Sequence, residues 1–220
     1  MNANEQKLSG KTIERLSRYR RELEQALRQR GEKAQVFSHE LAEMCGYTAA
    51  QVRRDLMAVG HSSSTSRGYD CRELVCAISE TLGRRKVRRM VLVGAGRLGR
   101  ALLGHFVDRR HMFAPVAVFD HDGEKIGKMI HGVPCHAIDD MEEFVRRERV
   151  RIAILTMPAK GAQEMAERLV HSGVRGILNF APIALRVPSG VFVENTDISV
   201  TLEKVAFFAG GEAPVGEEGQ

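Results

Sequence analysis

The stretch MVLVGAGRLGRAL at residues 90–102 decides the fold. Its apolar start predicts a buried strand, and its three glycines lead into helix-forming residues. In such a strand–turn–helix unit the first glycine permits a tight turn, the second lets the backbone approach a phosphate, and the third lets the helix pack on the strand. The N–H groups at the start of the helix attract an anion. The predicted phosphate loop consists of Gly94, Ala95, Gly96, Arg97, Leu98 and Gly99.

A second apolar run, PVAVFD at residues 115–120, follows the predicted helix and ends in an acid. The glycine pattern alone is weak evidence, since a chain with 21 glycines can contain it by chance. At the end of the second strand, however, Asp120 is placed to accept hydrogen bonds from the ribose hydroxyls of the adenosine and to repel the 2′-phosphate of NADP. Its distance from Gly94 exceeds the usual spacing of about 20 residues, which a longer loop would absorb. We therefore expect NAD(H).

The charge of the chain is unevenly distributed along its 220 residues, a length that suits one or two domains. Residues 1–89 hold 18 Lys and Arg against 11 Asp and Glu, whereas residues 90–220 hold 15 against 17. A basic N-terminal part favours a polyanionic partner, although an ordinary solvated surface can be equally basic.

Targeting segments and metal sites are not expected. No apolar run is long enough to span a membrane, and the polar start MNANEQKLSG has no signal-peptide core, so we expect a cytoplasmic protein. The four cysteines form no CxxC pair. The nearest approach to a metal-binding spacing is His131, Cys135 and His136, and we expect free thiols and no metal.

The N-terminal part is predicted to be a helix-turn-helix. Residues 11–29 form an amphipathic helix, Ser38 is placed to cap a short second helix, and Thr48 with Gln51 forms a predicted capping box for a third. The third is the expected recognition helix, where small Ala50 allows close entry into the major groove. Its predicted core residues are Val52, Leu56 and Val59, and its predicted outer residues are Gln51, Arg54, Asp55 and Ala58.

A serine-rich segment, GHSSSTSRGY at residues 60–69, follows the recognition helix. This is the position of the wing in a winged-helix domain, in which Ser63 and Arg67 would contact phosphates or the minor groove. A plain linker would have the same composition. A fourth helix over residues 70–82 and the sequence GRRK at 83–86 complete this domain.

From residue 90 onward, predicted strands and helices alternate, with one irregular piece through Pro134. This alternation predicts an α/β fold with a doubly wound parallel sheet that binds its ligand at the carboxyl ends of the strands. Two segments at that end, TMP at 156–158 and NFAP at 179–182, both stop at a proline. The residues expected to line the nicotinamide side are Thr156, Pro158, Asn179 and Pro182.

The last predicted helix, residues 197–209, has too many apolar residues for a surface helix, so we expect it to be buried in a partner subunit or between domains. The tail has the composition of disorder. The predicted domains are therefore a winged-helix domain (1–85), a Rossmann domain (86–196), a dimerisation helix (197–210) and a disordered tail (211–220).

In these segments the chain resembles the Rex family of redox-sensing transcriptional repressors. The matching segments are TAAQVRRDL (48–56), VGAGRLGRAL (93–102), FDHD (119–122), LTMPA (155–159), GILNFAP (176–182) and VENTD (193–197). The resemblance implies a homodimer that binds an inverted-repeat operator in double-stranded DNA and is released when NADH binds in competition with NAD⁺. It also implies a C-terminal helix exchanged between the subunits.

The resemblance assigns roles to several residues. Arg53 and Arg54 match the basic pair of the recognition helix, and Arg21 and Asp197 match a pair used in the switch between the two dimer shapes. The serine-rich wing and Ile198 depart from the family pattern. The expected DNA-binding residues are Thr48, Ala50, Gln51, Arg53, Arg54, Ser63 and Arg67. Two alternatives stay open: an NAD-dependent dehydrogenase-like enzyme with an N-terminal helical appendage, and a module for another nucleotide such as coenzyme A.

Overall fold

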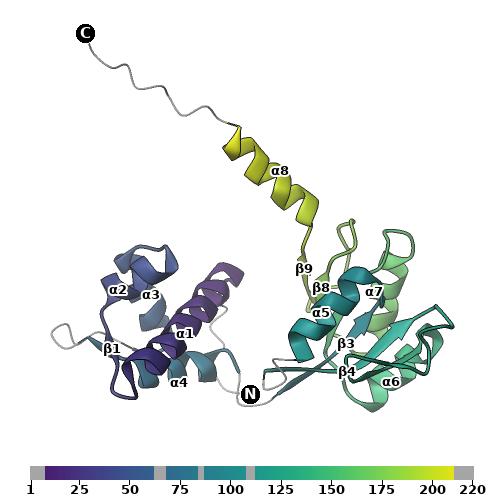
Figure 1. Ribbon diagram of the computed structural model, residues 1–220, viewed down its shortest axis with the longest axis horizontal. Helices are drawn as coiled ribbons and strands as arrows, with labels where there is room; N and C mark the ends of the chain where they lie inside the picture. The colour runs from purple at the N-terminus through teal and green to yellow at the C-terminus, as the bar shows by residue number, and fades with distance from the viewer. Residues whose placement is uncertain (1–7, 62–67, 84–86, 108–111, 211–220) are drawn as a thin grey trace, which may run out of the picture. The chain divides into compact units, whose positions relative to one another are not determined.

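The computed structural model describes residues 8–61, 68–83, 87–107 and 112–210. It divides into two compact units, residues 1–86 and residues 87–220 (Figure 1). The predicted wing contacts Ser63 and Arg67 and the predicted disordered tail lie outside the described residues.

The first unit is a small helical domain with a two-stranded antiparallel sheet. The helices are α1 (Gly10–Arg30), α2 (Ser38–Cys45), α3 (Ala49–Ala58) and α4 (Cys71–Thr81), and the strands are β1 (Gln35–Val36) and β2 (Tyr69–Asp70). The side chain of Asp70 caps α4 by accepting the N–H groups of Arg72 and Glu73. Since β1 precedes α2 and β2 comes after α3 in the chain, the paired strands bring the two ends of the helix-turn-helix together.

Two of the expected caps differ in the structure. Helix α2 begins at Ser38 instead of being capped by it, and the Glu40 carboxylate accepts the N–H of Phe37. Thr48 does cap α3, because its hydroxyl oxygen accepts the N–H of Gln51 at 3.2 Å. The reciprocal half of the predicted capping box is replaced, since the Gln51 side chain donates to a carboxylate one turn further along α3.

That carboxylate belongs to Asp55, which was expected on the outer side of α3 and is instead buried, with 3% of its surface exposed. Arg15 of α1 donates two hydrogen bonds to it, at 2.6 and 2.8 Å, and the Tyr19 hydroxyl donates a third at 3.0 Å. Gln51 supplies a fourth at 3.0 Å. The prediction was wrong because helical spacing shows which residues share a face, but not that an ion pair can bury a carboxylate.

The second unit contains a seven-stranded sheet with the strand order β5-β6-β4-β3-β7-β8-β9. All neighbouring strands run parallel except β5 and β6. The strands are β3 (Arg88–Val93), β4 (Phe113–Asp120), β5 (Met129–Ile130), β6 (Val133–Ala137), β7 (Ile152–Leu155), β8 (Gly176–Asn179) and β9 (Phe192–Asn195). From β6 to β9 this is the doubly wound order 3-2-1-4-5-6, so the order reverses between β3 and β7.

Strand β6 is a correction, because the sequence through Pro134 was expected to be irregular. β6 pairs with β4 along Cys135 and His136, and β5 pairs with β6, so the segment extends the sheet by two strands. The run is short and interrupted by a proline, which is why its alternation was not recognised. The predicted helix that follows is divided into a 3-10 turn (Ile138–Asp140) and α6 (Met141–Arg147).

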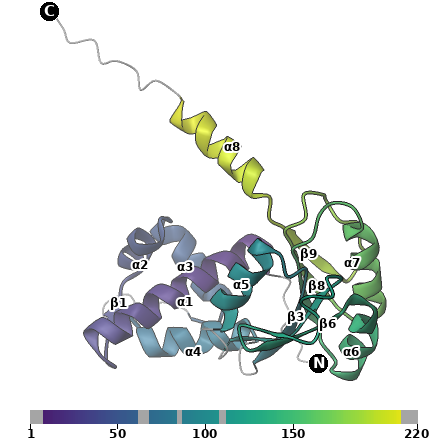
Figure 2. The same ribbon diagram turned by 45° about the vertical axis from the view of Figure 1, so that its right-hand side comes forward.

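Helices cover the sheet unequally, as Figure 2 shows. On one face, α6 and α7 (Ala162–His171) bury side chains of β3, β4, β7 and β8. On the other face, α5 (Arg97–Val107) covers β3 and β4 through Leu103. Beyond α5 a pocket of about 710 Å³ lies at the amino ends of β7, β8 and β9, lined by residues that include Leu178 and Phe192. Phe192 is 61% exposed there.

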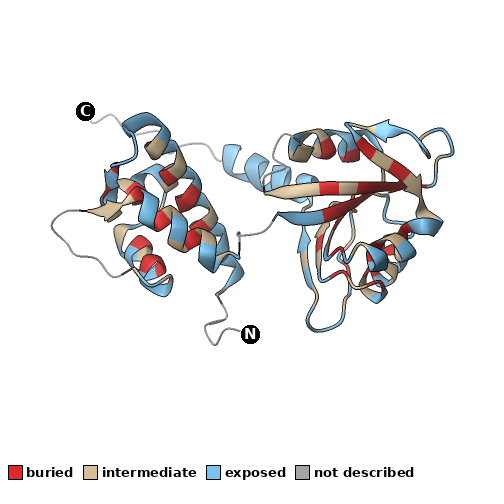
Figure 3. Ribbon diagram, turned by 90° about the horizontal axis from the view of Figure 1, so that it is seen from below, coloured by how far each residue is buried: buried red, intermediate tan, exposed pale blue. Residues whose placement is uncertain are grey.

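The last helix, α8 (Ile198–Ala209), has no buried residue and is coloured as exposed along its length in Figure 3. Asp197 caps it by accepting the N–H groups of Ser199 and Val200 on one carboxylate oxygen. Its exposed large apolar residues are Ile198, Val200, Leu202, Val205, Phe207 and Phe208. In the described part of the chain, no helix is both long and apolar enough to cross a membrane.

Removing the Asp55 carboxylate should destabilise the first unit. Asp55→Ala leaves the partly buried Arg15 guanidinium without its counter-ion, and we expect a loss of about 3 kcal/mol in the free energy of unfolding. Urea titration measures this loss, with the exposed Glu14→Ala as the matched control. Equal stability of the two variants would contradict the structural role of Asp55.

The same loss should depend on pH. Burial raises the pKa of Asp55, but the hydrogen bonds from Arg15, Tyr19 and Gln51 outweigh it and leave the pKa below its usual value. A carboxylate with a lowered pKa stabilises the fold above its unfolded pKa of about 3.9 and loses that contribution as the pH falls through the folded pKa. The stability difference between wild type and Asp55→Ala should therefore be constant near neutrality and shrink in acid.

Candidate functional site

The glycine loop lies at the point where the strand order reverses. Gly94 follows β3 with φ of 99°, and a Cβ there would lie 2.8 Å from the carbonyl oxygen of Thr156. A Cβ on Gly99 would lie 2.0 Å from the carbonyl oxygen of Gly94. Both glycines are therefore required by the packing of α5 and of the segment after β7 against the loop.

Gly96 differs from these two glycines, because a Cβ there would meet nothing within 4 Å. It is exposed and immediately precedes the first turn of α5. The N–H groups of that turn have no preceding helical acceptor, so they point toward this open space. The geometry matches what a pyrophosphate needs: room beside the backbone and unpaired donors at a helix N-terminus.

Thr156 connects the loop to the neighbouring strand. Its backbone N–H donates to the carbonyl of Val93 at 2.9 Å, and its hydroxyl donates to the carbonyl of Gly94 at 2.6 Å. Pro158, two residues further on, is exposed. Thr156 thus holds the shape of the glycine loop, and the segment through Pro158 borders the same end of the sheet.

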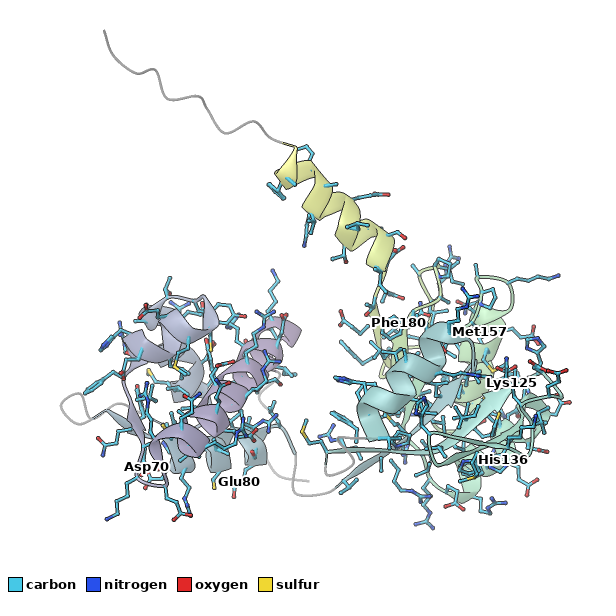
Figure 4. All side chains as sticks on the ribbon, in the orientation of Figure 1. Asp70, Glu80, Lys125, His136, Met157 and Phe180 are labelled. Carbon is cyan, nitrogen blue, oxygen red and sulfur yellow. The ribbon has the colours of Figure 1, made fainter. Side chains whose placement is uncertain are left out.

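Asp120 ends β4 beside the loop and is buried, with 3% of its surface exposed. Its carboxylate accepts the N–H of Ala95 at 2.6 Å and the N–H of Asp122 at 2.9 Å. Lys125, labelled in Figure 4, places its ammonium 3.3 Å from Asp120 and 3.1 Å from Asp122. Burial raises the pKa of Asp120, but the hydrogen bonds from the backbone N–H groups and Lys125 lower it by more. The net pKa is below its usual value, so the carboxylate is ionised at neutral pH.

Asn179, at the end of β8, is fully buried. Its amide nitrogen donates to the carbonyls of Ala181 and Ile183 and to the side chain of Asn195, while its oxygen accepts the N–H of Ala181. The side chain is therefore occupied in holding the loop that carries the exposed Pro182. Asn179 can act on a ligand only through the shape of this loop.

The exposed residues of α3 lie on one side of the helix: Ala50, Arg53, Arg54, Met57 and, at its end, Ala58. Arg53 donates to the Ser38 hydroxyl at 3.1 Å, while Arg54 has no side-chain partner among the described residues. Gln51 is directed toward Asp55 and away from this face. The face is basic, and the major groove of DNA is wide enough to admit an α-helix.

Sequence reasoning did not identify three of these residues. Met57 follows Arg53 by one helical turn, so the spacing from Ala50 could have revealed it. Lys125 is part of the polar loop after β4, where composition alone gives no signal. The partner of Asp55, Arg15, comes from another helix, and only the fold brings the two together.

The two expected switch residues belong to different units. Arg21 of α1 has a side chain that is 67% exposed, with its nearest acidic group, Glu22, at 3.8 Å. Asp197 uses one carboxylate oxygen to cap α8. Among the described residues, which include His131, Cys135 and His136, no group of three or more His, Cys, Asp or Glu side chains could hold a metal ion.

Comparison with known proteins gives two family models, one for each unit. Residues 7–56 match "Putative DNA-binding protein N-terminus" and residues 85–183 match "CoA binding domain". The redox-sensing transcriptional repressor Rex of Carboxydothermus hydrogenoformans is 43% identical over 201 residues, which cover 91% of this chain and 96% of that protein.

Two solved structures of RSP, described as a Rex-family repressor, resemble this chain along most of its length. Its complex with β-NADH has a TM-score of 0.82 and covers 93% of this chain and 95% of its own. Its complex with β-NAD⁺ and operator DNA has a TM-score of 0.85 and covers 92% of each chain. The sequence identity is 34% in both cases.

The glycines allow a matched pair of substitutions. Gly96→Ala should fold normally, because its Cβ meets no atom, but should weaken NADH binding, because it fills the space beside the helix N-terminus. Gly99→Ala should destabilise the second unit as well, because its Cβ collides with backbone. NADH fluorescence titration together with urea unfolding measures both effects. A Gly96→Ala variant with wild-type NADH affinity would place the pyrophosphate elsewhere.

Proposed function

Because this chain belongs to the Rex family of redox-sensing transcriptional repressors, we propose how its two units divide that function. The protein is a DNA-binding repressor and not an enzyme; it senses redox state through NADH, with NAD⁺ as the competing form. The dehydrogenase alternative is set aside by relatives that are repressors over nearly the whole chain. A repressor acts where the DNA is, which supports a cytoplasmic location.

The observation that carries the proposal for DNA is the basic exposed face of α3. We assign base reading to Arg54, whose guanidinium is free among the described residues and can form a bidentate contact with guanine. Arg53 and the Thr48–Ala50 start of α3 position the helix against the phosphates. Gln51, expected to read bases, is assigned a positioning role because its amide is bound to Asp55. Ser63 and Arg67 remain proposed wing contacts.

The nucleotide is proposed to bind along the carboxyl ends of the strands. The open space at Gly96 and the first turn of α5, including the N–H groups of Arg97 and Leu98, would hold the pyrophosphate. Asp120 would accept the ribose hydroxyls, and its negative charge disfavours a 2′-phosphate and the 3′-phosphate of coenzyme A. Thr156 and Asn179 would shape the two loops whose prolines border the nicotinamide.

The two oxidation states of the dinucleotide differ in the charge of the nicotinamide ring. NADH supplies a neutral nicotinamide ring, whereas the ring of NAD⁺ is positively charged. Burying an unpaired charge is costly, so an apolar cleft accepts the reduced ring more readily. A ligand that prefers one of two dimer shapes shifts the population toward that shape.

We further propose that the protein is a homodimer in which α8 is exchanged. The helix exposes six large apolar side chains, more than a monomer would leave in water. The second unit, in turn, has a pocket in which apolar residues such as Leu178 and Phe192 lie beside five arginines: Arg88, Arg89, Arg149, Arg151 and Arg175. A partner's α8 would cover such a surface, and a two-fold dimer matches an operator with inverted half-sites.

The switch is proposed to be an ion pair between Arg21 and the Asp197 of the other subunit. The helix cap uses only one oxygen of Asp197, so the other can accept a guanidinium. Arg21 is exposed, and its ion pair with Glu22 on α1 is long, at 3.8 Å. If the pair forms in one dimer shape only, it links the position of the DNA-binding unit to that of α8.

The experiment that tests the DNA assignment is operator binding by Arg54→Ala. Losing a bidentate base contact should cost about 1–3 kcal/mol in specific binding and leave NADH binding and dimerisation unchanged. Gel shift and NADH titration on the same preparation measure this. Wild-type operator affinity would show that α3 is not the recognition helix.

Asp120→Ser tests the ribose assignment. The variant removes the acceptor and the repulsion of a 2′-phosphate together, so NADH affinity should fall and the preference for NADH over NADPH should narrow. Competition titrations with the two nucleotides measure the ratio of their affinities, with Glu143→Ala, an exposed acid on α6, as control. Unchanged selectivity would move the ribose site to another acid, with Asp122 the first candidate.

Removing residues 197–220 tests the exchange of α8. The shortened chain should be monomeric, bind NADH weakly and lose tight operator binding, because one half-site supplies only part of the contacts. Sedimentation velocity gives the oligomeric state. A dimer that persists after the truncation would show that α8 does not hold the subunits together.

A further inference from the structure

The DNA-facing side of α3 carries one large apolar residue. Met57 is 64% exposed, more than any other large hydrophobic residue described in the first unit. It follows Ala50, Arg53 and Arg54 at positions i+7, i+4 and i+3, which share one face of a helix. The side chain therefore lies in line with the basic pair and not on a separate patch.

The buried network around Asp55 fixes this orientation. Hydrogen bonds from Arg15 and Tyr19 hold Asp55 against α1, so α3 cannot rotate about its axis without breaking them. Val52 and Leu56, which are fully buried, hold the same side of the helix. The orientation of the exposed face is thus fixed within the unit. A partner that contacts Arg54 on this face therefore also meets Met57.

We propose that Met57 reads a thymine, through contact of its thioether side chain with the 5-methyl group in the major groove. This inference rests on the proposed role of α3 as the recognition helix. The thymine methyl is the apolar group that base pairs display in the major groove, and it is met by apolar side chains. Methionine is flexible and polarisable, so it adapts to such a surface.

The charge around Met57 favours DNA as the occupant of this face. Arg53 and Arg54 flank it on the same surface, and a polyanion satisfies both guanidiniums while its groove covers the apolar side chain. An apolar protein partner would instead have to desolvate the two arginines without pairing them. Met57 consequently adds an A·T preference next to the base pair that Arg54 reads.

The test begins with a duplex that the full chain selects from a random library. Thymines in each half-site are then replaced one position at a time by uracil, which lacks the methyl group and keeps the hydrogen-bonding edge. At the position read by Met57, the wild-type chain should bind about fourfold more weakly per half-site, the factor expected for one buried methyl group.

Met57→Ala should weaken binding to the thymine duplex by about three- to tenfold and should not distinguish thymine from uracil at that position. Met44→Ala, which truncates a partly exposed methionine on α2, is the matched control and should keep both the affinity and the discrimination. NADH titration of each variant verifies that the second unit is unchanged.

Two results would overturn the inference. Met57→Ala with wild-type affinity, or with a full thymine–uracil difference retained, would show that Met57 does not contact the methyl group even if Arg54→Ala weakens binding. If Arg54→Ala binds like wild type, the recognition-helix assignment itself fails. The two variants therefore separate failure of the inference from failure of the proposed function.

Discussion

The approach of α5 to the loop after β3 is the constraint on which the nucleotide site depends. Gly99 lies so close to the Gly94 carbonyl that no larger residue fits, and Thr156 bonds to the same carbonyl. The start of α5, the end of β3 and the end of β7 are thereby held at the switch point of the sheet. The loop is packed against α5 and the segment after β7 at Gly94 and Gly99, whereas at Gly96, between them, it borders open space.

In the first unit, the buried ion pair between Arg15 and Asp55 fixes the position of α3 against α1. Asp55 accepts four hydrogen bonds from α1 and from its own helix, so α3, the proposed recognition helix, is firmly attached to α1. Arg21 also belongs to α1. If the proposed ion pair with Asp197 shifts α1, the exposed face of α3 would move with it and keep its shape. We propose that α1 transmits the effect of nucleotide binding to α3, whose orientation on α1 stays fixed.

Much of this structure could be predicted from the sequence, and the failures have physical causes. The glycine loop, the alternation of strands and helices and the Thr48 cap are local signals, and the structure contains all of them. Asp55 was misplaced because its burial depends on Arg15, forty residues away. Strand β6 was missed because its pairing with β4 is not visible in a run interrupted by Pro134. The hydrogen bonds of Asn179 to its own loop were not foreseen, because residue type does not show which partners a buried amide finds; its place beside the ligand stays a prediction.

This repressor senses NADH, and we propose that its preference for NADH over NAD⁺ drives release of the operator. The most direct measurement is operator affinity at fixed total nucleotide while the NADH:NAD⁺ ratio is varied, in wild type and Arg21→Ala. Wild type should release DNA as the NADH fraction rises, and Arg21→Ala should lose part of that response, on the order of 1–3 kcal/mol of coupling. A wild-type response driven equally by NAD⁺ would contradict the account, because a ligand that binds both shapes equally shifts neither.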